Sequence, residues 1–174
     1  MMKWTLIVGG VLLAVVVLAL VVGAMLPRDH VASSNADIPA PPDSVWNAMA
    51  DVANAPKWRD VKSVEILSTT GEPLRWREVS GFGPIIFVQE ESNAPRRFVA
   101  RIADTDQGFG GTWTYDIEPA GNGSRVTITE RGFVANPLFR FLSRFVFGYH
   151  GTQEAYLRAL GKKFGAAVAP RRVE

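Results

Sequence analysis

The hydrophobic pattern of the chain opens with an uninterrupted apolar run. Residues 4–26 contain no charged side chain and are rich in Val and Leu. As a helix this run would be about 34 Å long, and the hydrocarbon core of a bilayer is about 30 Å thick. The pattern therefore predicts a membrane anchor that, with a short linker, occupies residues 1–29. A cleaved signal peptide is the alternative, because Val22 and Ala24 have the spacing that signal peptidase favours, although such peptides have apolar cores of only about 7–15 residues.

The residues on either side of the apolar run bear on its orientation and reach. Lys3 lies before it and Arg28 just after it. With the terminal amine added, this balance favours an N-terminus in the cytoplasm and a domain on the non-cytoplasmic side. The linker Pro27–Asp29 covers at most about 10 Å when extended. We therefore expect the domain to lie close against the bilayer.

From residue 30 onward, short segments typical of β-strands recur. His30–Ile38 is the first, and prolines at 39, 41 and 42 end it. Asp43 is a candidate N-cap for a short helix that Asn54-Ala-Pro56 would end. Six further strands are predicted, separated by turns rich in Gly, Pro and Asn: Val61–Ser68, Leu74–Ser80, Ile85–Glu91, Arg96–Asp104, Gly111–Glu118 and Ser124–Phe133. Such short connections join antiparallel neighbours, so we expect a seven-stranded curved antiparallel sheet.

The last long segment, Asn136–Phe164, has the period of an amphipathic helix. Apolar residues fall on one broad face, and most of the charged residues fall opposite: Phe141, Leu142, Phe145, Val146, Tyr149, Tyr156, Leu157, Leu160 and Phe164 form the apolar face. Gly148 and Gly151 weaken the helix between them, so a kink that would gate a pocket is expected there. Residues 166–174 are predicted to be a flexible tail. The fold class is α+β, a sheet that grips one long helix and leaves a cavity beneath it.

Strand and helix periodicity point to a set of residues for the lining of that cavity. Alternation places Trp76 and Glu78 on one face of a strand, and Trp113 and Tyr115 on one face of another. Helical spacing aligns Tyr149, Gln153 and Tyr156. The predicted ligand-binding residues are thus Trp76, Glu78, Trp113, Tyr115, Tyr149, Gln153 and Tyr156. Apolar walls with a few polar groups are typical of small-molecule sites. The alternative is that these aromatic residues are packed core.

Two carboxylates are candidates for acid–base chemistry. Glu78 and Glu130 fall on strand faces shared with apolar residues, and desolvation of a carboxylate raises its pKa toward neutrality. The alternative is that each pairs with an arginine of a neighbouring strand. The sequence leaves open whether any reaction is catalysed.

Composition excludes several other kinds of site. The chain has no cysteine and only two histidines, at 30 and 150, so thiol chemistry is excluded and a metal centre is not expected. No phosphate-binding glycine loop or nucleophile elbow is present, and we expect no cofactor. The 19 basic and 17 acidic residues nearly balance. Basic residues gather after residue 137, but they are not interleaved with aromatics as nucleic-acid binding requires, so no nucleic acid is expected.

The order of strand, short helix, six-strand meander and long helix resembles the START/Bet v 1-like (SRPBCC) helix-grip superfamily. The chain is most similar to its polyketide cyclase/dehydrase-like branch. The resemblance lies in five segments: Ile38-Pro-Ala-Pro with Val45-Trp46, Ala55-Pro-Lys-Trp58, Gly111-Thr-Trp-Thr-Tyr115, Ile117-Glu-Pro119 and Val126-Thr-Ile-Thr-Glu130. It implies a ligand-binding domain over residues 30–165 with an apolar pocket between sheet and C-terminal helix. Members bind lipids or other hydrophobic molecules, and a minority are enzymes, without a shared catalytic set.

Three functions follow as hypotheses. The first is a membrane-tethered binding domain for a hydrophobic small molecule or lipid. The second is a cyclase- or dehydratase-type enzyme in which Glu78 or Glu130 acts with a tyrosine. The third is a protein-interaction module whose basic helix face would contact a partner that the sequence does not identify: Arg140, Arg144, Arg158 and Lys162 form that face.

Overall fold

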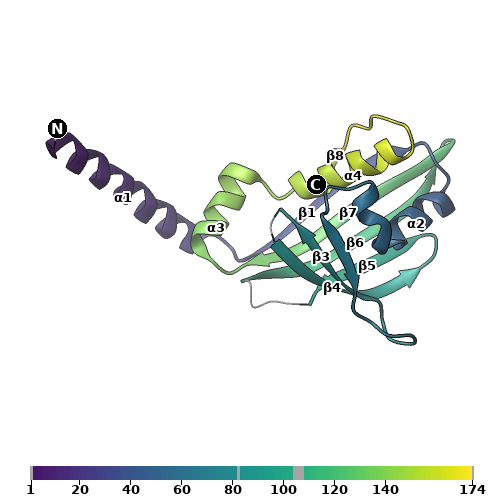
Figure 1. Cartoon of the computed structure of the whole chain (residues 1–174). Helices are drawn as coiled ribbons and strands as arrows, with labels where there is room; N and C mark the ends of the chain where they lie inside the picture. The colour runs from purple at the N-terminus through teal and green to yellow at the C-terminus, as the bar shows by residue number, and fades with distance from the viewer. Residues whose placement is uncertain (1, 82, 104–107, 174) are drawn as a thin grey trace.

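A computed structural model of the chain describes residues 2–81, 83–103 and 108–173. Its N-terminal helix, α1 (Met2–Met25), projects away from the rest of the molecule, as Figure 1 shows. The part from Leu6 to Met25 is long and apolar enough to cross a membrane, a criterion that a signal sequence also meets. Most side chains of α1 are exposed, whereas Ala19 and Gly23 are buried.

The body of the molecule is a curved antiparallel sheet of eight strands. Their order across the sheet is β2-β3-β4-β5-β6-β7-β1-β8. The strands are β1 (Asp29–Ile38), β2 (Ser63–Ile66), β3 (Arg75–Ser80), β4 (Gly83–Asn93), β5 (Arg97–Ile102), β6 (Phe109–Ala120), β7 (Gly123–Val134) and β8 (Arg171–Val173). The first seven match the strands expected from the sequence. Asp104, at the end of one predicted strand, and Phe82, in a predicted turn, lie outside the described residues.

The eighth strand corrects the predicted count of seven. β8 lies in the segment expected to be a flexible tail, and it pairs with residues 33–35 of β1. Two features favour this pairing. β1 would otherwise be an open edge of the sheet, and Arg172 Nε donates to Glu154 Oε1 at 2.9 Å. The sheet edge therefore captures part of the C-terminal segment.

A short helix and a 3-10 turn cover one end of the sheet. The helix α2 (Pro42–Ala50) follows β1, and the turn η1 (Val52–Lys57) leads into β2. Pro41 is the N-cap residue, in place of the expected Asp43, and Pro42 at the first helical position has the fixed φ angle that suits a helix start. Val45, Trp46 and Met49 point from α2 into the core.

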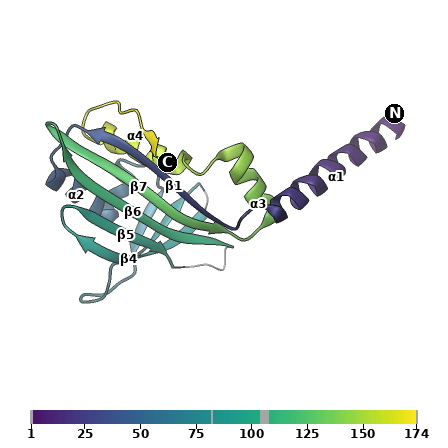
Figure 2. The ribbon, with the colours of Figure 1, turned by 180° about the vertical axis from the view of Figure 1, so that it is seen from behind.

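The segment Asn136–Phe164, predicted as one long helix with a kink at Gly148 and Gly151, is broken into separate pieces at that kink. The segment forms α3 (Pro137–Leu142), a π-helical turn η2 (Ser143–Phe147) and, after a break, α4 (Gly151–Lys163). Gly148 at the break has φ 73°, which only glycine adopts readily. The two halves then take different partners, because α3 packs against α1 whereas α4 packs against β1. Figure 2 shows α3 between α1 and the sheet.

The hydrophobic core lies between the inner face of the sheet and the helices α2 and α4. Tyr156, Leu157 and Leu160 of α4 pack against side chains from the middle of the sheet: Ala36, Ile38, Trp76, Phe98, Ala100, Ile117, Val126 and Ile128. The chain therefore has the α+β helix-grip architecture, with α4 as the gripped helix.

Candidate functional site

The strand register brings polar and aromatic residues into rows on the inner face of the sheet. Trp113 of β6 pairs with Glu130 of β7, which pairs in turn with Ala32 of β1. In the next row, Tyr115 pairs with Ile128. Because directly paired residues point to the same face, Trp113, Glu130 and Tyr115 belong to one concave surface. This surface beneath α4 is the candidate site.

Aromatic rings occupy much of the space between the sheet and α4. The rings of Tyr115 and Tyr156 lie 5.4 Å apart, and Trp58 meets Tyr156 edge-on at 5.3 Å. Farther along the face, Trp76 stacks on Phe87 at 5.3 Å. Their separations and tilts are those of favourable aromatic pairs. Side chains that reach from the sheet to the helix thus fill part of the space where the cavity was expected.

An ion pair lies within this aromatic cluster. Arg59 follows η1 and donates to Glu78 of β3 at 2.5 Å, and its guanidinium also lies 4.8 Å from the ring centre of Tyr156. Both charged side chains are mostly buried. An arginine thus pairs with Glu78, as the alternative interpretation expected, but it comes from the turn before the sheet and not from a neighbouring strand. This contact fixes one oxygen of Glu78 as the acceptor of a charged donor.

The surroundings shift the pKa values of three of these groups. Burial raises the pKa of Tyr156 to about 12. Burial, with a contribution from Tyr156, also raises the pKa of Tyr115 well above its ordinary value. For Arg59, burial alone would lower the pKa, but Tyr156 and Glu78 outweigh it and the pKa is raised. At neutral pH the cluster therefore combines neutral phenols with a charged guanidinium.

A second polar group lies at the end of the concave surface nearest α1. The ring of His30 stacks on Tyr149 at 4.0 Å, and its Nε2 is 3.5 Å from Glu130 Oε1. Both His30 and Glu130 side chains are largely shielded from solvent. Nearby, Ser34 Oγ and His150 Nδ1 are 3.2 Å apart. Tyr149 and His150 belong to the break between η2 and α4, so this group joins the sheet to the hinge.

Some buried polar atoms of the concave surface lack a hydrogen-bond partner. Among the described residues they include Trp76 Nε1, Gln153 Oε1 and His30 Nδ1. Gln153 is fully buried, and only its Nε2 is satisfied, by the Ala32 carbonyl at 2.9 Å. A buried donor or acceptor without a partner costs about 1–3 kcal/mol. Each of these atoms would gain a hydrogen bond if a polar group came within reach of it.

The structure brings most of the predicted site residues together, but not all. Trp76, Trp113, Tyr115 and Tyr156 lie in or against the core, and the side chain of Gln153 is buried between α4 and β1. Tyr149 is separated from them by the helix break and contacts His30. Trp58 and Arg59 were missed, because only the Pro56 turn before them suggested a fixed position and nothing indicated that they fold inward.

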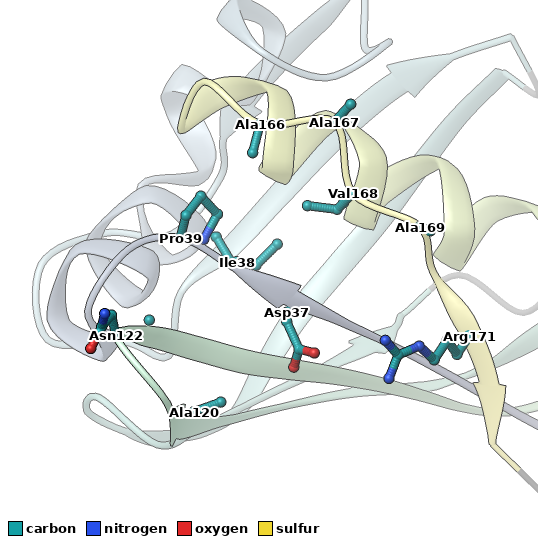
Figure 3. A pocket seen from close by; sticks show the side chains of 11 residues that line it. Asp37, Ile38, Pro39, Ala120, Asn122, Ala166, Ala167, Val168, Ala169 and Arg171 are labelled. Atoms are coloured by element: carbon teal, nitrogen blue, oxygen red, sulfur yellow. The ribbon is translucent and has the colours of Figure 1, made fainter.

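Two surface pockets in the described part of the chain lie elsewhere. One groove of about 480 Å³ lies between the end of β1, the β6–β7 hairpin and the segment after α4 (Figure 3). Asp37 and Arg171 are its charged residues. A second, of about 450 Å³, borders the outer side of α4. Neither includes the residues predicted for the site.

The basic helix face expected to contact a protein partner is not formed as predicted. Arg140 is buried, and its Nη1 donates to the Leu26 carbonyl at 2.8 Å. Arg158 lies on α4 and pairs with Glu154 at 3.0 Å. Because α3 and α4 are separated by the break, Arg140 and Arg158 do not share one helix face.

Comparison with known proteins gives a consistent result over the whole body of the molecule. The model of a family described as polyketide cyclase / dehydrase and lipid transport matches residues 29–165. A comparison with curated proteins found no match.

Solved structures share the fold at low sequence identity. A protein from Thermus thermophilus is 24% identical, with a TM-score of 0.62 over 79% of this chain and 99% of its own. The Zhui aromatase/cyclase from a Streptomyces species is 18% identical, with a TM-score of 0.62 over 79% of this chain and 94% of its own. A START superfamily protein from Mycobacterium smegmatis is 16% identical, with a TM-score of 0.61 over 78% and 97%.

Proposed function

Because the chain belongs to the polyketide cyclase / dehydrase and lipid transport family, we propose that it binds a hydrophobic small molecule or lipid on the concave surface beneath α4. The observation that carries this proposal is the set of unpartnered polar atoms among buried aromatic rings, Trp76 Nε1 and Gln153 Oε1. A mostly apolar site with a few polar groups suits a ligand that has an apolar body and one or two polar atoms.

Binding requires the aromatic cluster to open. Tyr156 lies on α4, whereas Tyr115 and Trp58 lie on the body of the domain. A displacement of α4 about Gly148 and Gly151 would separate these rings, since glycine tolerates large changes in backbone angles. The ligand would then replace ring–ring contacts with contacts to itself. Arg59 offers a cation to a ligand carboxylate or enolate.

We also propose that α1 is a retained membrane anchor. Its length and composition permit a span. α1 packs against α3 of the domain, where Gly23 lies against the backbone of Pro137, and Arg140 of α3 donates to the Leu26 carbonyl just after α1. Cleavage after Ala24, the position that the spacing of Val22 and Ala24 indicates, would remove Gly23 and with it the contact to Pro137. The charge balance around α1 favours a domain on the non-cytoplasmic side.

Photo-crosslinking in a membrane tests the binding proposal. The full chain is reconstituted in lipid nanodiscs with a diazirine-bearing stearic acid, irradiated, digested and mapped by mass spectrometry. We expect adducts on peptides that contain Trp113, Tyr115 and Gln153. The variant Trp113→Ala should reduce them, whereas Thr114→Ala, on the opposite face of the same strand, should not. Adducts confined to α1 and α3 would contradict the proposal.

A cyclase-type reaction is a second candidate function. The observation that favours it is the group formed by His30, Glu130 and Tyr149, in which an imidazole lies between a carboxylate and a phenol ring. Such a group can accept and return a proton. Glu78 is less suited to this role because Arg59 holds it. If the chain is an enzyme, Glu130→Gln should abolish turnover of a polyketide substrate. Turnover that survives this change would remove Glu130 from the mechanism.

A further inference from the structure

The segment between β7 and the helix break exposes a group of large apolar side chains. We call α3 and η2 together, residues 137–147, the α3–η2 segment. Four of its side chains are more than half exposed, namely Phe139, Phe145, Val146 and Phe147, at 58, 59, 61 and 68%. Phe145 and Val146 belong to the face that the sequence pattern predicted to be apolar. Soluble surfaces seldom show such a cluster unless it has a partner.

The position of this segment beside α1 indicates which partner. α3 packs against α1, whose buried residues Ala19 and Gly23 are one turn apart. A methyl group added at Gly23 would collide with the Pro137 carbonyl, so the two backbones are in close contact. Both positions lie within about 10 Å of the end of α1 at Met25. If Leu6–Met25 spans a bilayer, α3 therefore lies at the level where the acyl chains meet the headgroups.

Hydrogen bonds stabilise α3 and attach it to the end of α1. Asn136 Oδ1 accepts from the backbone N–H groups of Leu138 and Phe139 and so caps the first turn of α3. Arg140 satisfies a carbonyl at the end of α1 with a charged donor, which the negative end of the helix dipole favours. Both close backbone packing and a charged hydrogen bond therefore hold α3 against the end of α1.

We propose that the α3–η2 segment is a second membrane element that lies in the interfacial layer of the bilayer beside α1. This inference rests on the anchoring role proposed for α1. Exposed Phe and Val side chains supply the apolar face of an interfacial helix, and the exposed Arg144 supplies a charge that can reach the headgroups. The occupant of the exposed apolar surface is therefore lipid.

The proposal also places the site relative to the membrane. Phe147, the last residue of the segment, precedes the hinge Gly148–Gly151, where Tyr149 stacks on His30. His30 itself follows Met25 by only five residues. The hinge end of the concave surface therefore faces the bilayer. The ligand class that this geometry selects is a lipid-soluble molecule that passes between membrane and site without crossing water.

Spin-label accessibility tests the inference on the full chain. Because the chain contains no cysteine, single substitutions can each carry one nitroxide: Val16→Cys in α1, Phe145→Cys and Phe147→Cys in η2, and Thr70→Cys in the exposed β2–β3 loop. In nanodiscs of phosphatidylcholine and phosphatidylglycerol, collision rates with oxygen and with a nickel chelate report depth. We expect the labels at 16, 145 and 147 to favour oxygen by at least several-fold over the label at 70.

The outcomes distinguish the proposal for the α3–η2 segment from the proposal that α1 is a membrane anchor. Labels at 145 and 147 that behave like the label at 70, while the label at 16 is lipid-exposed, would overturn the interfacial element and leave the anchor intact. An aqueous label at 16 would overturn the anchor as well. Strong spin–spin broadening at 145 and 147 would show that a second copy covers the surface, which would also contradict the proposal.

Discussion

The amide of Gln153 donates a hydrogen bond to the backbone carbonyl of Ala32, with 2.9 Å between Nε2 and the oxygen. Both residues are buried, so this bond holds α4 on β1 in surroundings without water. The bond therefore fixes the start of α4, just after the hinge, over the concave surface. Any movement of α4 that admits a ligand has to break or re-form this bond.

We predict that Gln153→Leu destabilises the domain, because the Ala32 carbonyl would lose its side-chain donor in a buried place. The expected loss in the free energy of unfolding is about 1–3 kcal/mol. Chemical denaturation followed by tryptophan fluorescence measures it. The neighbouring exposed residue provides the control, since Thr152→Ala should change the same quantity by no more than about 0.5 kcal/mol. Equal effects of the two variants would show that the bond to Ala32 has no net stabilising role.

Alkaline stability should depend on Tyr156. Its pKa in the folded state is about 12, against 10 for an ordinary tyrosine. A raised folded pKa means that the neutral phenol stabilises the fold below pH 10, and that this contribution is lost as the pH rises from 10 to 12. The loss is at most about 3 kcal/mol. Between pH 9 and 11.5, Tyr156→Phe should therefore lose less unfolding free energy than the wild type. If the unfolding free energy of both proteins falls equally over this pH range, the raised pKa does not belong to Tyr156.

The attachment of β8 should depend on Glu154. Hydrogen bonds from Arg172 and Arg158 hold the pKa of this carboxyl below its ordinary value of 4.5, so the ion pairs stabilise the fold above that pH and are lost as the pH falls through the lowered pKa. Glu154→Gln should speed amide exchange in residues 171–173 at pH 7. The stability cost should be under about 1 kcal/mol, because both arginines are exposed.

Measurements on Glu154→Gln at acid pH provide a control. The difference in unfolding free energy between wild type and Glu154→Gln should vanish once Glu154 is protonated. Glu118→Gln, an exposed change on β6, should leave exchange in residues 171–173 unaltered. If β8 exchanges as slowly in Glu154→Gln as in the wild type, backbone pairing with β1 is sufficient to hold it.

Close contact between α1 and α3 should require glycine at position 23. Gly23→Ala would force the two helices apart, because the new methyl group meets the Pro137 carbonyl, whereas Gly10→Ala has open space around it. Electron–electron distance measurements between nitroxides at positions 16 and 145 in nanodiscs check this. We expect a longer or broader distribution for Gly23→Ala and no change for Gly10→Ala. Identical distributions for both would contradict the contact.

Strand alternation predicted the inner face of the sheet well, because side chains in a strand alternate strictly. Trp76, Trp113 and Tyr115 were assigned to inward faces, and all three pack in or against the core. The eighth strand was missed because Arg171–Val173 has only three residues and is polar, so its pairing with β1 depends on a free edge far away in the sequence.

The sequence predicted a kink at Gly148 and Gly151, but it did not predict that the two halves of the helix take different partners, because helical periodicity does not say what an apolar face contacts. Phe145 and Tyr156 share one face by spacing. In the structure, Phe145 is 59% exposed, and Tyr156 is buried against the sheet. The partner of the first half, α1, had been treated as separate from the domain. The inward position of Arg59 was equally unpredictable, since it depends on a carboxylate and an aromatic ring brought to it by the fold.

The most direct test of the central claim is to identify what the site holds. The full chain is purified in nanodiscs, extracted with organic solvent and analysed by mass spectrometry beside the variants Trp113→Ala and Thr114→Ala. The account predicts a defined apolar molecule, close to one per chain, that is retained with Thr114→Ala and depleted with Trp113→Ala. Recovery of only the bulk nanodisc lipids, in equal amounts from all three proteins, would contradict it.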